Sequence, residues 1–202
     1  PKNEFIYEFV AEPEGTHFYH CHWGTLMHMQ AGMFGSLIVE NPKDPIKEKF
    51  PYEREYTLVY SAHDTNYIRE EMNGMLERMK QRSYLMKQGR FTSEQWGVFD
   101  NKEQFLASME NGYQPPYVTN RRSNAELPQA NWFTVNGKSY PSTPYLFIKS
   151  GENIRVRLIN AGAETHHLHL HGHDFWMVAD DGVPLEHPWK RNTVPLTPGK
   201  TF

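Results

Sequence analysis

A lone cysteine flanked by histidines is the first feature of the sequence with the residue types for metal chemistry. His20, Cys21 and His22 are consecutive, and His28 and Met33 follow within the next eleven residues. A thiolate, an imidazole and a weakly bound thioether form the ligand set of a blue-copper electron-transfer site. Because side chains alternate faces along a strand, His20 and His22 would point away from Cys21 and could bind other metal ions. The pattern predicts two metal sites joined through Cys21.

A second histidine cluster lies in the last quarter of the sequence. Five histidines occupy eight positions, namely His166, His167, His169, His171 and His173. On a strand, His169 and His171 would share one face. Neutral imidazole is a good ligand for copper and for zinc. The cluster predicts further metal ligands, and the alternative is a histidine-rich tract that sequesters zinc or nickel.

The composition indicates a β-rich protein. The 202 residues carry a formal net charge of -3, with 14% aromatic residues, 14 glycines and 14 prolines. Many glycines, prolines and aromatics favour short strands and tight turns over a helical bundle. The charge gives no basic surface, so we expect no nucleic-acid partner. No apolar run reaches the roughly 20 residues of a membrane span, and a single cysteine cannot form an internal disulfide.

Short runs rich in β-branched and aromatic residues predict the strands that position the two clusters. The predicted strands are residues 5–10, 16–21, 34–40, 56–61, 132–137 and 153–160. The segment 56–61 would be the last strand of the first sandwich. His63 follows it, and we interpret this histidine as a strand-end residue rather than as support for a metal site.

The middle of the sequence has a different pattern. Apolar residues recur there at helical spacing, at Ile68, Met72, Met75, Leu76 and Met79. They predict a helix ending near Gly89, and a capping box at Asp100 predicts a second helix. We therefore expect part of a β-domain at 1–63, a partly helical insertion at 64–128 and part of a second β-domain at 129–202. Since a complete β-sandwich needs about 100 residues, we expect the chain to be incomplete at both ends.

Both histidine motifs resemble those of multicopper oxidases, and of laccases in particular. Residues 15–33 are similar to the family's His-Cys-His, His and Met signature, and residues 166–176 to its His-x-x-His-x-His-Gly-His element. Residues 133–141 and 149–162 resemble the strands that lead to that element in laccases. The resemblance covers residues 5–60 and 130–200 and excludes the insertion. It implies a mainly β fold of cupredoxin-like Greek-key β-sandwiches.

The resemblance also implies an activity and its cofactors. Such enzymes couple one-electron oxidation of a small reducing substrate, a phenol or a metal ion, to reduction of dioxygen to water, using type 1, type 2 and type 3 copper. The type 1 ligands would be Cys21, His28 and Met33. The ligands to the trinuclear cluster would be His20, His22, His169 and His171, with electrons passing from Cys21 through His20 and His22. His166 stands where laccases place a type 1 ligand and is a further candidate.

One spacing differs from that of laccases. His28 follows Cys21 by seven positions, whereas a spacing of five is common in laccases. The longer loop resembles two-domain oxidases with type 1 copper in the first domain, and it also leans toward copper nitrite reductases. His22 favours the oxidase, because the reductases have a non-ligand there. The non-catalytic alternative is a copper-binding electron carrier, and the ordinary alternative for Cys21 is a buried core thiol.

Several ligands that the family needs are absent from the sequence, including an upstream His-x-His pair. We therefore expect further domains or chains to complete the copper sites, with a homotrimer as in two-domain relatives. The resemblance also implies a periplasmic or secreted protein, although the first residues are not a signal peptide.

Overall fold

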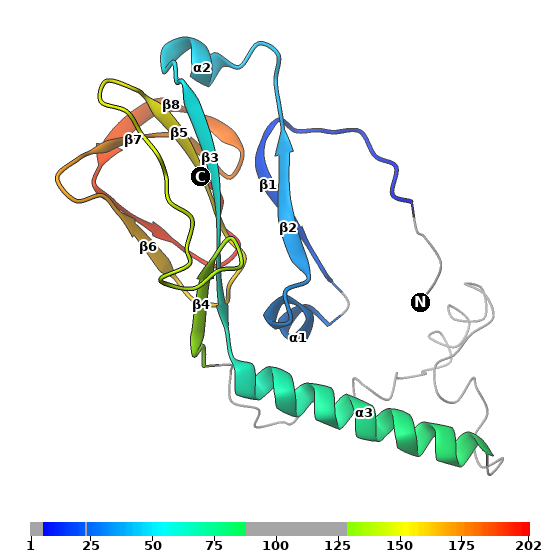
Figure 1. Ribbon diagram of the computed structural model, residues 1–202. Coiled ribbons are helices and arrows are strands. Elements are labelled where there is room, and N and C mark those ends of the chain that lie inside the picture. Colours follow the sequence, from blue (N-terminus) through cyan, green and yellow to red (C-terminus); the bar gives the residue numbers. More distant parts are fainter. Residues whose placement is uncertain (1–5, 23, 88–128) are drawn as a thin grey trace. The chain divides into compact units, whose positions relative to one another are not determined.

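The computed structural model describes residues 6–22, 24–87 and 129–202 (Figure 1). The chain divides into two compact units, residues 1–65 with 130–202, and residues 66–129. All the described strands belong to the first unit. No helix within the described ranges is long and apolar enough to cross a membrane.

A hairpin with a helical connection holds the first motif. Strand β1 (Gly15–His20) pairs antiparallel with β2 (Phe34–Val39), and α1 (Thr25–Gln30) lies between them. The predicted strands 16–21 and 34–40 are therefore confirmed, although the first ends at His20. The predicted strand at 5–10 is wrong for residues 6–10, which form no strand. A strand needs a neighbour for its backbone hydrogen bonds, and no described strand pairs with this segment.

Strand β3 (Arg54–His63) is the centre of a three-stranded sheet. It pairs antiparallel with β4 (Trp132–Val135) and parallel with β5 (Ile154–Asn160), in the order β4-β3-β5. We expected β3 to be the last strand of the first sandwich, yet both of its partners come from beyond residue 130. The helix α2 (Pro45–Lys49) immediately precedes β3. The domain limits at 63 and 129 remain a prediction.

Two further antiparallel pairs follow, and most of these strands were not predicted. Strand β6 (His166–His169) pairs with β9 (Thr193–Leu196), and β7 (Phe175–Asp180) pairs with β8 (Val183–Arg191). The expectation of one strand through the histidine cluster is wrong beyond His169, because the chain turns at His171 and Gly172, where the glycine has a φ of 74°. Such a left-handed conformation suits glycine and ends the strand.

The core of this unit joins four strands that are distant in sequence. The buried apolar side chains come from β3, β5, β7 and β9, and are Leu58, Leu158, Met177, Val194 and Leu196. Burying one such side chain contributes roughly 1.5–3 kcal/mol. The core therefore ties the sheet that contains β3 to the strands that flank the second histidine cluster.

In the second unit the structure describes one long helix. The helix α3 (Thr65–Lys87) confirms the predicted helix as far as Lys87. Its many Glu, Met, Leu, Lys and Arg residues have high helix propensity. The expected end at Gly89, the second helix and the polar linker lie outside the described residues.

Candidate metal centre

The connection between β1 and β2 brings a thiol and an imidazole together. Cys21 Sγ lies 2.9 Å from His28 Nδ1, and both side chains are partly buried. The backbone of Met33 ties the two residues to one another. Its carbonyl accepts from Cys21 N–H at 3.1 Å, and its own N–H donates to the His28 carbonyl at 2.9 Å. The Met33 side chain itself is 53% exposed. The three predicted type 1 ligands thus belong to one closed loop.

His20 and His22 flank Cys21 with their rings near each other. Their centroids are 5.9 Å apart. His20 Nδ1 lies 3.1 Å from the Cys21 carbonyl oxygen. A carbonyl can only accept, so Nδ1 carries the proton and Nε2 keeps a lone pair that can bind a metal.

The second cluster offers a similar pair. The rings of His169 and His171 are 4.9 Å apart and lie edge to face. His169 Nδ1 lies 3.0 Å from the Asn192 carbonyl oxygen and 2.7 Å from Thr193 Oγ1. These contacts fix the proton on Nδ1 and leave the Nε2 lone pair for a metal, an arrangement typical of metal-binding histidines.

His166 has an aromatic environment. Its ring centroid is 5.5 Å from that of Tyr60 and 6.3 Å from that of Phe133. Burial lowers the pKa of His166, against the opposing charge of Glu164. Its buried Nε2 has no hydrogen-bond partner among the described residues. The lowered pKa favours the neutral ring that a metal ligand requires, and Nε2 is not used in another hydrogen bond among the described residues.

The structure assembles the predicted ligands in pairs. Over the described ranges, no group of three His, Cys, Asp or Glu side chains is arranged to hold a metal ion. The donors nevertheless fit copper, since a thiolate beside an imidazole suits a blue-copper site and paired imidazoles suit a copper cluster. The Cys21 and His28 side chains would hold the blue copper ion. The pairs His20/His22 and His169/His171 would contribute ligands to the copper cluster.

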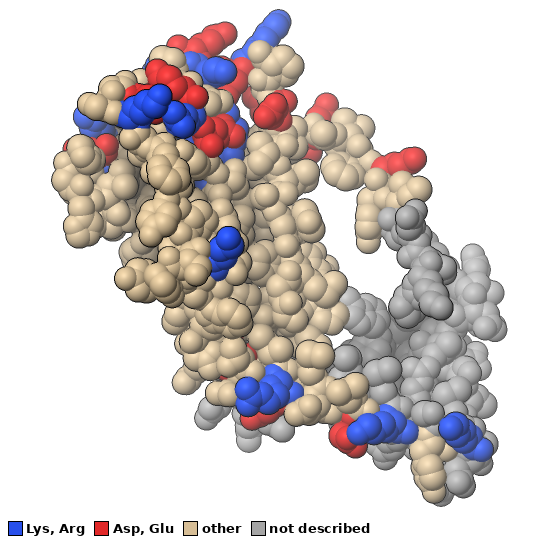
Figure 2. Space-filling model, in the orientation of Figure 1, with Lys and Arg blue, Asp and Glu red and all other residues tan. Residues whose placement is uncertain are grey.

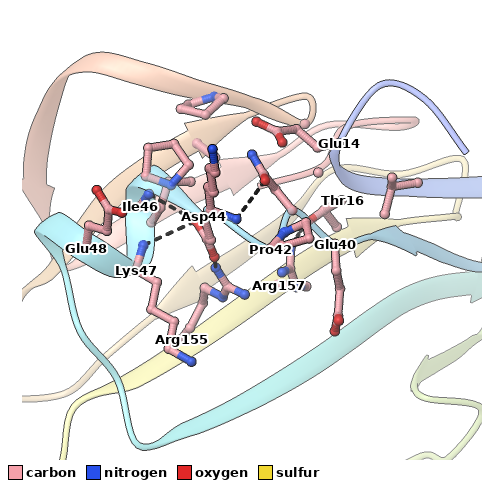
Figure 3. A pocket seen from close by; sticks show the side chains of 18 of the residues that line it. Glu14, Thr16, Glu40, Pro42, Asp44, Ile46, Lys47, Glu48, Arg155 and Arg157 are labelled. Atoms are coloured by element: carbon pink, nitrogen blue, oxygen red, sulfur yellow. Dashed lines mark hydrogen bonds and ion pairs between the residues drawn. The ribbon is translucent and has the colours of Figure 1, made fainter.

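A cavity of about 420 Å³ lies elsewhere in the same unit, beside α2 (Figure 3). None of the predicted metal ligands lines it. Asp44 accepts from the first N–H groups of α2 and from Arg155, and Arg157 donates to Thr16 Oγ1 at 2.8 Å. Figure 2 shows charged side chains of this unit gathered around α2. Because Arg155 pairs with Asp44, and both Arg155 and Arg157 pair with Glu55, we interpret these four residues as a structural ion-pair network.

The sequence interpretation missed a contact of the Cys21 loop, which is the connection between β1 and β2 at residues 21–33. His63 Nδ1 lies 2.7 Å from the carbonyl oxygen of Gln30, the last residue of α1. Only the position of His63 at the end of a predicted strand hinted at such a contact. It links the loop that carries the thiol to β3.

Comparison with known proteins identifies the family. Residues 98–202 match a family model described as multicopper oxidase, and residues 1–44 match a second model with the same description. A copper resistance protein A homolog from Pseudomonas syringae pv. tomato is 25% identical over 92% of this chain and 31% of its own length. An L-ascorbate oxidase from Brassica rapa subsp. pekinensis is 26% identical over 100% of this chain and 31% of its own length.

A solved structure agrees with these matches. The blue copper oxidase from Nitrosomonas europaea superposes with a TM-score of 0.66 at 29% identity, over 100% of this chain and 48% of its own. The matched solved multicopper oxidases have the cupredoxin fold, so the predicted mainly β, cupredoxin-like class is confirmed. The chain spans about a third of the length of the curated relatives that it matches. With one family model matching more than half of its residues, the chain belongs to the multicopper oxidase family.

Proposed function

We propose that the chain contributes to an enzyme that oxidises a small reducing substrate, a phenol or a metal ion, and reduces dioxygen to water. The observation that carries the proposal is the 2.9 Å contact between Cys21 Sγ and His28 Nδ1. A thiol and an imidazole nitrogen this close can share one metal ion, and Met33 closes the same loop. The similarity of the chain to a blue copper oxidase and to an L-ascorbate oxidase supports the same class of reaction.

Each predicted ligand has a separate role in this proposal. Bound copper would supply the one-electron redox chemistry. The Cys21 loop holds the electron-entry ligands together through the Met33 backbone. His20 and His22 are bonded directly to Cys21 through the main chain, so the covalent route from the thiolate to each neighbouring imidazole is short. His169 contributes from β6, with its tautomer fixed by the Asn192 carbonyl and by Thr193.

The assembly and location of the protein are part of the proposal. The described residues bring the ligands together only in pairs, so each copper site needs ligands from other segments or chains. A homotrimer, with the cluster formed between subunits, would supply them. The resemblance of the motifs to laccases supports a periplasmic or secreted location.

The test is a copper count combined with spectroscopy on the full chain. We expect a blue absorption band, a near-ultraviolet band from a coupled copper pair, and dioxygen uptake with a phenolic or metal-ion donor. Cys21→Ser should lose the blue band and substrate oxidation, because serine offers no thiolate. His187→Ala is the matched control, since that histidine has a side chain that is 91% exposed and lies outside every predicted ligand set.

Three results would contradict the proposal, each in a different way. One type 1 and one type 2 copper without a coupled pair would indicate a copper nitrite reductase. A blue band without dioxygen uptake would indicate an electron carrier. Full turnover by Cys21→Ser would exclude electron entry through the thiolate.

A further inference from the structure

We propose that His63 is a positioning residue that anchors the Cys21 loop to β3 through Gln30, and so holds the electron-entry copper ligands in place. The inference rests on the proposed function, because it concerns the same loop. It assigns a role to a histidine that is not a predicted ligand.

The helix α1 cannot hold its position alone. It has six residues, and no side chain caps its first turn. Isolated helices this short are unstable in water. It contains His28 and ends at Gln30, so the position of the predicted imidazole ligand depends on what fixes α1 from outside.

Gln30 supplies that external contact. Gln30 is only 5% exposed, and its side chain hydrogen-bonds to the backbone at the end of β3. The amide nitrogen donates to the Ala62 carbonyl at 3.2 Å, and the amide oxygen accepts from Asp64 N–H at 2.6 Å. The Gln30 carbonyl accepts from His63 Nδ1 at 2.7 Å. Three hydrogen bonds therefore join the end of α1 to Ala62 and His63 of β3 and to Asp64, which directly follows β3.

His63 extends this contact into the sheet. Because the Gln30 carbonyl can only accept, Nδ1 of the neutral ring carries the proton and Nε2 must accept. Ser61 Oγ lies 2.8 Å from Nε2, so its hydroxyl donates there. Ser61 Oγ can then accept from Thr134 Oγ1 of β4, 2.7 Å away. Both hydroxyl residues are buried, and buried polar groups with all partners satisfied make a rigid network.

The ring of His63 also contacts the other end of the loop. Its centroid is 6.4 Å from that of Phe34, with the planes 21° apart, and 6.3 Å from that of Trp132. Phe34 directly follows Met33. His63 therefore contacts the chain two residues after His28 and one residue after Met33, so it restrains the backbone next to each of these two predicted ligands.

Two substitutions at His63 test the hydrogen bond to Gln30 against a common background in which the ring is absent. In His63→Asn the amide nitrogen lies as many bonds from Cα as Nδ1 and can still donate to the Gln30 carbonyl. In His63→Gln the amide lies at the distance of Nε2, so it keeps the contact with Ser61 and loses the one with Gln30. Both variants lose the aromatic ring, so they differ mainly in the proposed anchor. His17→Gln is the matched control. His17 Nε2 hydrogen-bonds the Pro13 carbonyl oxygen at a distance of 2.9 Å, and neither residue belongs to the loop.

The readouts are the blue absorption band and the Cu(II) affinity of that site, measured on the full copper-loaded chain by competition with a chelator. Loss of a group that orients metal ligands weakens metal binding by about 10–100-fold. Because His63 acts through Gln30, we expect His63→Gln to weaken binding by about tenfold and to shift the band. His17→Gln should retain the wild-type band and affinity, and His63→Asn, which keeps the hydrogen bond to Gln30 and loses the ring contacts, should lie closer to the wild type than His63→Gln.

A purely structural role for His63 would lower thermal stability in both variants without moving the band. Equal behaviour of His63→Asn and His63→Gln, whether both match the wild type or both lose copper, would overturn the inference. A wild-type chain that binds copper without a blue band would overturn the proposed function, and this inference with it. A blue wild type with equal variants would overturn the anchor alone.

Discussion

Glu55 is the most informative position for testing how the first unit is held together. Its carboxylate accepts from Arg157 Nε at 2.9 Å and from Arg155 Nε, and its side chain is 26% exposed. Arg155 also pairs with Asp44, which caps α2, and Arg157 reaches Thr16 of β1. One carboxylate therefore connects α2, β1, β3 and β5. Glu55→Gln removes its charge with almost no change of shape.

The expected cost follows from these contacts. A hydrogen bond to a charged group is worth about 1.5–3 kcal/mol. Glutamine keeps one acceptor, but its NH2 group then faces one of the two guanidinium groups. We expect a loss of about 2–3 kcal/mol, less than for a fully buried ion pair. For a chain of this size, 1 kcal/mol shifts the melting temperature by about 2–4 °C. The variant should therefore melt about 4–12 °C lower than the wild type.

The effect should depend on pH. Burial raises the pKa of Glu55, but the hydrogen bonds and charges of Arg157 and Arg155 outweigh burial and lower the pKa below 4.5. A carboxyl group with a lowered pKa in the folded state stabilises the protein above its unfolded pKa, and this stability is lost as the pH falls through the folded pKa. The difference between Glu55→Gln and the wild type should be complete at neutral pH and should shrink below pH 4.5.

Thermal unfolding followed by circular dichroism, at neutral and at acid pH, measures this difference. Glu77→Gln is the matched control, because Glu77 forms an exposed pair with Lys80 and exposed pairs contribute little. A melting temperature for Glu55→Gln no lower than that of Glu77→Gln would refute the ion-pair contribution. So would a difference from the wild type that persists unchanged into acid.

Two further substitutions test other contacts. Gly15→Ala should lower the free energy of unfolding by about 2 kcal/mol or more. Gly15 has a φ of 127°, and a Cβ there would overlap the backbone of Gly182. An unchanged midpoint of urea unfolding would contradict this close approach. Thr193→Val removes a hydroxyl 2.7 Å from His169 Nδ1 and should weaken copper retention by about tenfold; copper per chain after dialysis against a chelator measures this, and full retention would count against His169 as a ligand.

Local pattern was sufficient to predict the hairpin and the helix. Alternating residues gave the strands at 16–21, 34–40 and 153–160, and helical spacing gave α3, because side-chain periodicity reports which faces are buried. The candidate metal ligands could be proposed from their residue types and spacing. The approach of Cys21 to His28 agrees with that proposal, since a loop of seven residues can fold back on itself.

Long-range pairing could not be read from the same patterns. The parallel pairing of β3 with β5 joins residues about 100 positions apart. The residues of a strand do not indicate which other strand it pairs with. The role of His63 was hidden for the same reason, because its partner Gln30 precedes it by 33 residues. The strands after His171 were missed because their alternation is weak.

The proposed function requires the Cys21 thiolate to bind copper. X-ray absorption at the copper edge of the loaded full chain tests it directly, because a short copper–sulfur contact is distinct from copper–nitrogen contacts. We predict a thiolate sulfur bound to copper in the wild type and in His187→Ala, and its loss in Cys21→Ser. Copper bound only by nitrogen and oxygen in the wild type would contradict the account.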